Sequence, residues 1–425
     1  MAELAPLAET GFIGIVSATR DRLAAQEVES PSMNPLSPIP AVLVLLAAIF
    51  TTRILVRALG APPAARRFAT IDGLRGYLAL FVFVHHAAIT YFNLRTGSWV
   101  RVPSTFYNFL GHGSVALFFM ITGFLFFSKI LDGRAKAIDW AKLYVSRLLR
   151  LTPMYLLSML LLLTIVGIVT QWQLREEPTI VLREAFKWLT FTILDSPDVN
   201  GLANTFTIDA GVTWSLPYEW FYYLLLPLFA FVIGARVPVV YLVIALATLT
   251  YLVHWDPEPY RSAAFLGGMA AAVFQRNSWP RRLAATHGAS LLAIGCLATC
   301  LAFPNVYAVG PLVLLSIAFI LIACGTNLFG VLVSTVSRSL GEAAYSIYLL
   351  HGIVLYVTFH FIFDHVSAAG LSAEQHWLVV AAATPLLVTI CFVTFRSVER
   401  PALGQTNNVT AWINARLPGS RAHAR

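Results

Sequence analysis

The chain has 425 residues, of which 58% are hydrophobic and only 12% are charged, and its mean hydropathy is +0.73. An ordinary soluble domain carries about 25% charged residues, so this composition excludes a typical soluble globular protein. The net charge of +8 at pH 7 does not indicate a nucleic-acid partner, because Lys and Arg accumulate in the cytoplasmic loops of membrane proteins.

Apolar runs of membrane-spanning length recur along the whole chain. About 20 predominantly apolar residues are enough for one helix to cross a bilayer. The first run covers 41–60, and a basic linker that contains proline follows it. Ten further segments have their cores at 74–92, 112–130, 149–170, 218–233, 238–254, 262–275, 286–303, 310–325, 341–363 and 377–395. The sequence therefore predicts an all-α polytopic membrane protein with about ten core transmembrane helices and an extra N-terminal helix.

The loops between these segments alternate in charge. The connection "SKILDGRAKAIDWAKLYVSRLLR" is dense in Lys and Arg, and "QRNSWPRR", "VSRSLG" and "RSVERP" are also basic. The intervening loops contain more acidic residues, as in "REEP", "DSPD", "WDPEP" and "FDH". Because basic loops stay in the cytoplasm, we expect both ends of the ten-helix core on the cytoplasmic side. The longest loop, 171–217, then lies on the outer side.

The segment "LRGYLALFVFVHHAAI" carries an arginine and two histidines inside an apolar run. Ionisable residues within a bilayer are costly and tend to mark function. From Arg75 to His86 is about three helical turns plus roughly 20°, so the two side chains share a face, roughly 16 Å apart along the axis. His85 points elsewhere. The structural alternatives are a snorkelling anchor for Arg75 and a helix–helix hydrogen bond for His86.

Basic residues also open the segment "YVSRLLRLTPMY". Arg147 and Arg150 are three residues apart and therefore share a helix face, with Tyr155 just inside the segment. Such a pair can hold a phosphate-bearing ligand through charge-assisted hydrogen bonds. Anchoring by the positive-inside rule is the simpler explanation of the charge alone.

Two later segments carry further polar side chains. Glu219 lies in "TWSLPYEWFYYLLLP", where the long outer loop enters a helix, and a carboxylate there also suits the helix dipole. His351 lies inside the span "LGEAAYSIYLLHGIVLY", near Tyr345 and Ser346. The histidines are not accompanied by a cluster of carboxylates or cysteines, so no metal site is predicted.

Together these motifs resemble the acyltransferase-3 family of membrane-bound acyltransferases. The arginine, ten residues, histidine spacing at Arg75–His86 is similar to the hallmark of that family. It is followed in order by "SVALFFMITGFL", "RLLRLTPMY", "TWSLPYEWFYYLLLPL", "FLGGMAAA", "LGEAAYSIYLLH" and "VERP". The resemblance divides the chain into an N-terminal extension with one transmembrane helix and a basic linker (1–70), an acyltransferase-3 membrane domain (71–401) and a basic cytoplasmic tail (402–425).

Members of this family move acyl groups, commonly acetyl, from cytoplasmic acyl-CoA to a hydroxyl of an extracytoplasmic or lipid-linked saccharide. The resemblance therefore implies a polysaccharide O-acetylase-like enzyme of the bacterial cytoplasmic (inner) membrane, with acyl-CoA as donor substrate and no bound cofactor. Long members add a soluble C-terminal domain. Because this chain ends soon after Pro401, we expect a stand-alone form.

The resemblance and the chemistry of the side chains suggest roles for the polar residues. Histidine has a pKa near neutrality, so His86 is the predicted general base, with Arg75 positioning the thioester or stabilising charge from the same face. Whether the acyl group first rests on His86 or His351 stays open. The residues expected to bind acyl-CoA are Arg147, Arg150 and Tyr155; those expected to support the substrate or the structure are Trp214, Ser215, Glu219, Tyr345, Ser346 and His351.

A transporter or flippase of a glycan or small solute is the alternative function. A proton-coupled carrier would also have many helices, a histidine near the middle of the membrane and basic residues at the cytoplasmic ends of its helices. The ordered set of motifs favours the enzyme.

Overall fold

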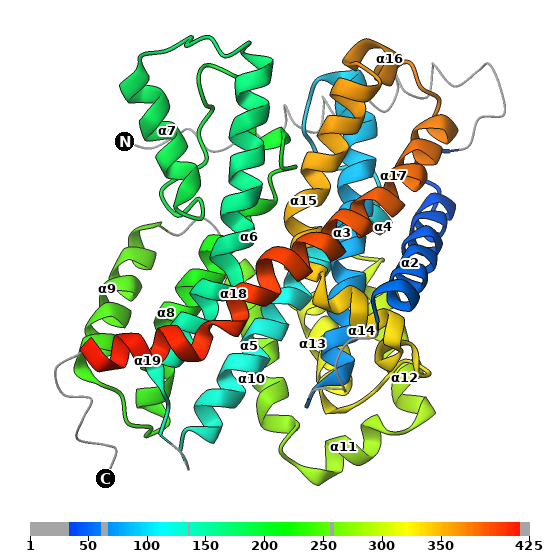
Figure 1. Cartoon of the computed structure of the whole chain (residues 1–425). Coiled ribbons are helices and arrows are strands. Elements are labelled where there is room, and N and C mark those ends of the chain that lie inside the picture. Colours follow the sequence, from blue (N-terminus) through cyan, green and yellow to red (C-terminus); the bar gives the residue numbers. More distant parts are fainter. Residues whose placement is uncertain (1–33, 61–66, 135–136, 256–258, 417–425) are drawn as a thin grey trace, which may run out of the picture.

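The computed structural model describes residues 34–60, 67–134, 137–255 and 259–416 (Figure 1). Within these ranges the chain is helical, with one isolated β-bridge and no strand, so the all-α prediction is confirmed. The predicted N-terminal extension before residue 34, part of its linker (61–66) and the end of the tail (417–425) lie outside the described residues.

Each of the ten predicted core segments forms a helix, and the extra N-terminal segment forms another. The extra helix is α2 (Ile39–Leu59). The core helices are α3 (Ala69–Thr96), α5 (Ser114–Asp132), α6 (Trp140–Val169), α8 (Leu216–Val232), α9 (Val239–Trp255), α10 (Pro259–Phe274), α12 (His287–Cys300), α13 (Val309–Cys324), α15 (Ala344–Val357) and α17 (Ala373–Thr394).

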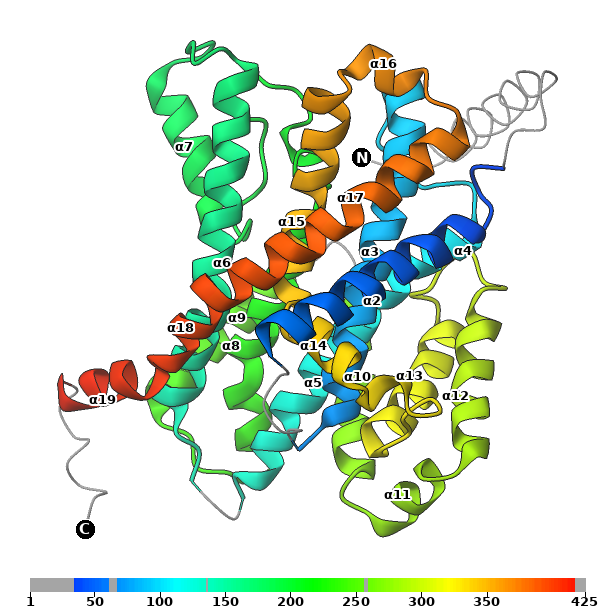
Figure 2. The ribbon, with the colours of Figure 1, turned by 45° about the vertical axis from the view of Figure 1, so that its right-hand side comes forward.

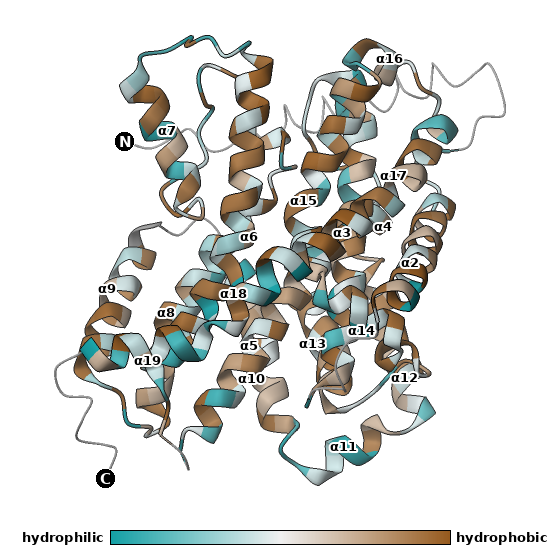
Figure 3. Cartoon of the chain, viewed as in Figure 1, coloured by the Kyte–Doolittle hydropathy of each residue, from teal (hydrophilic) through white to brown (hydrophobic). Residues whose placement is uncertain are grey.

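The helices differ in how completely they could cross a bilayer. Among the described residues, six helical runs are long and apolar enough to do so: Ile39–Leu59, Ala69–Thr96, Thr105–Asp132, Trp140–Val169, Ala344–Ile362 and Ala373–Arg416. The pair α11 (Ser278–Ala284) and α12 passes the same criteria together but is bent by 84°. Figure 3 shows hydrophobic residues along most of α2, α6 and α15. The chain is a multi-pass membrane protein.

The shorter helices pack closely against the long ones. A Cβ atom at Gly268 of α10 would lie 1.9 Å from the carbonyl oxygen of Met120 in α5. A Cβ atom at Gly123 of α5 would lie 2.4 Å from the carbonyl oxygen of Phe265 in α10. The two backbones touch, which explains why small residues recur in "FLGGMAAA": they permit close helix approach in a membrane.

The central helix of the bundle is α3, which carries Arg75 and His86. It contacts α5, α13, α14 (Thr335–Glu342), α15 and α17 (Figures 1 and 2). The contact with α14 is also close, since a Cβ atom at Gly341 would meet the carbonyl oxygen of Asp72 at 1.7 Å. A charged residue on such a helix must face other parts of the protein rather than lipid.

Several of the predicted cytoplasmic and outer loops lie at opposite ends of the bundle. The α5–α6 connection and α11 lie at the lower end in Figure 1, and α7 (Pro178–Leu189) and α16 (His365–Ala369) lie at the upper end. The chain continues after α17 through a π-helical turn, η6 (Phe395–Glu399), into α18 (Arg400–Gly404) and α19 (Thr406–Arg416). The described part of the predicted tail is thus helical, and α19 packs against α6.

Candidate active site

A pair of hydrogen-bonded histidines lies where α3 packs on α15. Nδ1 of His86 is 2.8 Å from Nε2 of His351, although the residues are 265 positions apart in the chain. Their rings are stacked, with centroids 5.1 Å apart and an interplanar angle of 14°. Nδ1 of His351 lies 3.0 Å from the carbonyl oxygen of Ile347, one turn earlier on α15.

These contacts select one arrangement of protons on the neutral pair. A carbonyl oxygen only accepts hydrogen bonds, so Nδ1 of His351 carries a proton and donates a hydrogen bond to the carbonyl oxygen of Ile347. Nε2 of His351 then has only a lone pair and accepts from Nδ1–H of His86. The remaining nitrogen of His86, Nε2, is left unprotonated, which is the state that a general base requires.

The two histidines differ in accessibility. His351 has no exposed surface, whereas His86 keeps 8% of its surface accessible. Beside His86 lies Trp99, whose ring is stacked at a centroid distance of 6.1 Å. Phe206 from the long loop meets Trp99 edge to face at 6.3 Å. The accessible surface of the histidine pair therefore belongs to His86, which lies next to this aromatic pair, and not to His351.

The neighbouring His85 has different partners. Its Nδ1 donates to the carbonyl oxygen of Tyr107 at 2.9 Å. Its ring fills the space beside Gly111, where a Cβ atom would lie 2.3 Å from the imidazole. His85 thus connects α3 to the short helix α4 (Thr105–Asn108) and the π-helical turn that follows. Its ring centroid lies 5.0 Å from that of His86, but its hydrogen bond goes to Tyr107.

Arg75 lies in a separate cluster from the histidine pair. Its Nη2 atom is 2.6 Å from Oδ1 of Asp72, one turn earlier on α3. It also interacts electrostatically with Glu399 of η6. Arg75 is therefore held among carboxylates on the predicted cytoplasmic side of His86.

Glu399 is the centre of this second cluster. Its side chain has no exposed surface, and its Oε2 atom is 3.7 Å from Nη1 of Arg150. Its Oε1 atom accepts a hydrogen bond from the hydroxyl of Ser346, and Tyr345 donates to the carbonyl oxygen of Leu151 at 3.1 Å. The fold thus brings the predicted residues Arg150, Tyr345 and Ser346 together.

Arg147 and Glu219 form the adjoining part of the cluster. Glu219 accepts from the hydroxyl of Thr122 at 2.9 Å and from the hydroxyl of Tyr223 at 3.3 Å. The Arg147 guanidinium lies 4.9 Å from the ring centroid of Phe126 and interacts electrostatically with Glu219. Glu219 is therefore placed among the arginines of α6, and not on the surface of the long outer loop that precedes it in the sequence.

The remaining predicted residues hold the outer loop in place. Tyr155 donates to the carbonyl oxygen of Trp188 at the end of α7, and its ring stacks on Phe191 at 4.2 Å. The hydroxyl of Ser215 lies 2.8 Å from that of Tyr348, and the ring of the adjacent Trp214 packs under the guanidinium of Arg261. The structure thus places Tyr155, Trp214 and Ser215 in contacts that fix the long loop.

Sequence reasoning assigned no role to two buried acids. Glu399 belongs to the motif "VERP", and a lone carboxylate at the end of an apolar segment was its only signal. Asp209 gave no signal, because it lies in the long loop. It is 1% exposed, and its Oδ1 atom accepts from the backbone N–H of Gly211 at 2.9 Å. Burial raises the pKa of Asp209 to about 7. Its backbone packs directly on Gly352, next to His351.

Comparison with known proteins identifies the family of the chain. A family model described as an acyltransferase domain matches residues 68–396, which is most of the chain. Comparisons with curated proteins and with solved structures each found no match. The matched region contains the whole histidine pair and the arginines of α3 and α6. The chain therefore belongs to the acyltransferase-3 family of membrane acyltransferases.

Proposed function

We propose that this acyltransferase moves an acyl group, acetyl in the first instance, from cytoplasmic acyl-CoA to a hydroxyl of an extracytoplasmic or lipid-linked saccharide. The observation that carries the proposal is the 2.8 Å contact between His86 and His351. It leaves an unprotonated nitrogen on the one histidine of the pair that retains accessible surface.

In the proposed reaction the acceptor hydroxyl attacks the thioester carbonyl while Nε2 of His86 removes its proton. The new C–O bond forms, the C–S bond breaks, and the leaving thiolate takes the proton back from His86. During this step the His86 cation donates its Nδ1–H to His351, so the developing positive charge stays paired with a fixed acceptor.

Direct transfer of the acyl group from the donor to the acceptor, without an acyl-enzyme intermediate, is the simpler reaction for this geometry. An acyl group on His351 would require a completely buried ring, and both of its nitrogens are already used by Ile347 and His86. His351 is therefore a positioning residue, which selects the tautomer of His86, and not the carrier of the acyl group.

The arginines Arg75, Arg147 and Arg150 are proposed to bind the donor. Each is close to a carboxylate: Asp72 for Arg75, and the Glu219–Glu399 side of the cluster for the two arginines of α6. These carboxylates hold the guanidinium groups in fixed positions, which suits the orientation of a thioester. Tyr155 supports α6 from the loop side rather than touching the donor.

Reconstitution of the full chain with a labelled acyl-CoA and isolated envelope saccharides tests the function. The label should appear in the saccharide as an ester that mild alkali releases. In cells, deletion of the gene should remove that ester while the polymer stays at normal abundance, as measured by mass spectrometry of envelope glycans. Loss of the whole polymer would contradict the enzyme and favour transport of a glycan.

The variant His351→Ala tests the role of the histidine pair. We expect kcat to fall by roughly 100-fold, because Nδ1–H of His86 loses its acceptor and the base is no longer held in one tautomer. His351→Gln should recover part of the activity, since its amide oxygen can accept the same hydrogen bond. The pH dependence of kcat should shift in His351→Ala, while the KM for acyl-CoA stays unchanged. A change confined to KM would contradict the positioning role.

A further inference from the structure

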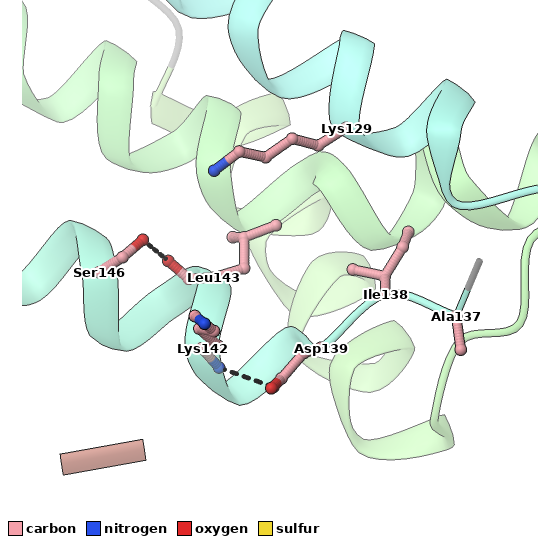
Figure 4. A pocket seen from close by; sticks show the side chains of 7 residues that line it. All are labelled: Lys129, Ala137, Ile138, Asp139, Lys142, Leu143 and Ser146. Carbon is pink, nitrogen blue, oxygen red and sulfur yellow. Dashed lines mark hydrogen bonds between the residues drawn. The ribbon is translucent and has the colours of Figure 1, made fainter. Parts of the chain in front are cut away.

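A cavity opens between the end of α5 and the start of α6. It has a volume of about 320 Å³ and is lined by Lys129, Ala137, Ile138, Asp139, Lys142, Leu143 and Ser146 (Figure 4). Small-molecule sites begin at about 300 Å³, so the cavity can hold one compact ligand group. It lies in the basic α5–α6 connection, which was predicted to face the cytoplasm.

The two lysines give the cavity its charge. Both side chains are exposed, and they come from different helices. Among the described residues, no carboxylate oxygen lies within ion-pair distance of either ammonium group. The nearby carboxylates have other partners: Asp139 caps α6 by accepting from the backbone N–H of Lys142 at 2.8 Å, and Asp132 pairs with Arg67 and Arg276. Two unneutralised ammonium groups therefore face one small cavity.

One residue of the cavity lining, Lys129, also lies beside the arginine cluster. Lys129 Nζ and the Arg147 guanidinium lie 5.0 Å and 4.9 Å from the centroid of the same Phe126 ring. Lys129 also interacts electrostatically with both Arg147 and Lys142. A row of positive charge thus runs from Lys142 through Lys129 and Arg147 to Arg150.

The two arginines of this row have carboxylate partners in Glu399 and Glu219, whereas in the part of the chain that the structure describes neither lysine pairs with a carboxylate. Like charges so placed are unfavourable unless an anion binds between them. The charge pattern therefore fits an elongated ligand whose phosphates lie at the lysine end of the row, near the predicted cytoplasmic surface. Ammonium groups bind phosphate as point charges. The hydroxyl of Ser146 is already directed to the carbonyl oxygen of Leu143 at 2.7 Å, but its oxygen can still accept a hydrogen bond.

We infer that the cavity of Lys129 and Lys142 binds the phosphate-bearing nucleotide end of coenzyme A. This inference rests on the proposed function. It assigns the two ends of one donor molecule to two different sites. The nucleotide phosphates lie at the lysines near the surface, and the pantetheine arm runs past Phe126 and Arg147 toward His86. The buried arginines then meet the thioester end rather than the phosphates.

Binding of adenosine 3′,5′-bisphosphate to the full chain in nanodiscs of zwitterionic lipid tests the inference. The double variant Lys129→Ala/Lys142→Ala should bind this probe roughly tenfold more weakly than the native protein, because two phosphate contacts are lost. The KM for acyl-CoA should rise by a similar factor with little change in kcat. Lys129→Arg/Lys142→Arg should restore binding, since the charges return. Arg282→Ala, which removes one exposed charge from α11 on the same side, is the matched control and should bind the probe normally.

Comparing the affinities for coenzyme A and dephospho-coenzyme A tests whether the two lysines bind the 3′-phosphate. The native protein should prefer the ligand with the 3′-phosphate, and the double variant should lose that preference. Equal binding by the native protein and the double variant would overturn the inference. So would a result in which the lysines change only the retention of an anionic lipid, because they would then bind headgroups. If the native protein binds neither form of coenzyme A, the proposed donor itself is wrong, and this outcome is distinct from failure of the cavity alone.

Discussion

Replacement of His86 by alanine should lower kcat for acyl transfer by about 10²–10⁴-fold, the usual contribution of a positioned general base. The variant retains the packing of α3, because His86 keeps accessible surface and makes its side-chain hydrogen bond only to His351 among the described residues. The measurement is the initial rate of transfer from acyl-CoA by purified protein, with membrane expression and thermal unfolding recorded for the same preparation. The KM for acyl-CoA should change little, since the lysines and arginines that are proposed to bind the donor are untouched.

His85→Ala is the matched control for this prediction. It removes the same side chain from the adjacent position, where the imidazole donates its hydrogen bond to Tyr107. We expect lower thermal stability and a kcat within a few-fold of the native value. Retained turnover in His86→Ala, or equal loss of turnover in both variants, would contradict the assignment of His86 as the base.

Replacement of Arg150 by alanine should destabilise the protein by about 3–5 kcal/mol. The reason is that Glu399 has no exposed surface, and removal of Arg150 takes away the one cation that lies within ion-pair distance of it among the described residues. The loss should be visible as a lower midpoint of thermal unfolding in detergent or nanodiscs. If Arg150 also positions the donor, acyl transfer by the surviving folded protein should fall as well.

The double variant Arg150→Ala/Glu399→Gln separates stability from donor binding. Replacing the carboxylate by an amide removes the unpaired charge, so most of the lost stability should return, and the two substitutions should be strongly non-additive. Activity should remain low, because the guanidinium is still absent. Normal stability in the single variant Arg150→Ala would show that Glu399 does not depend on this arginine, and recovery of activity in the double variant would exclude a role of Arg150 with the donor.

These predictions describe two chemical regions along one helix. The helix α3 carries Arg75 in the carboxylate–arginine cluster and His86 beside His351, and the two residues lie eleven positions apart on the same face of the helix. In the proposed reaction the donor enters past the cluster and the acceptor approaches His86 near Trp99. The proposed reaction therefore brings the two substrates to the same nitrogen from opposite sides.

Local patterns in the sequence determined the helices and the ordered motifs of the family. Apolar runs predict spans because a bilayer offers no partners for backbone polar groups, and all ten core segments are helices. Helical periodicity also separates His86 from His85, since the angle between residues on one helix depends only on their spacing. The different partners of these histidines in the structure agree with that separation.

Only the tertiary structure decided which side chains meet. Nothing in the local pattern pairs His86 with His351 or Arg150 with Glu399, because partners hundreds of residues apart are selected by helix packing and not by periodicity. For the same reason, the sequence gives no sign that the hydroxyl of Tyr155, which was predicted to bind acyl-CoA together with Arg147 and Arg150, donates to the end of α7. The sequence alone therefore determined the helices and the residue types available for catalysis, and the packing of α3 against α15 determined which nitrogen can act as the base.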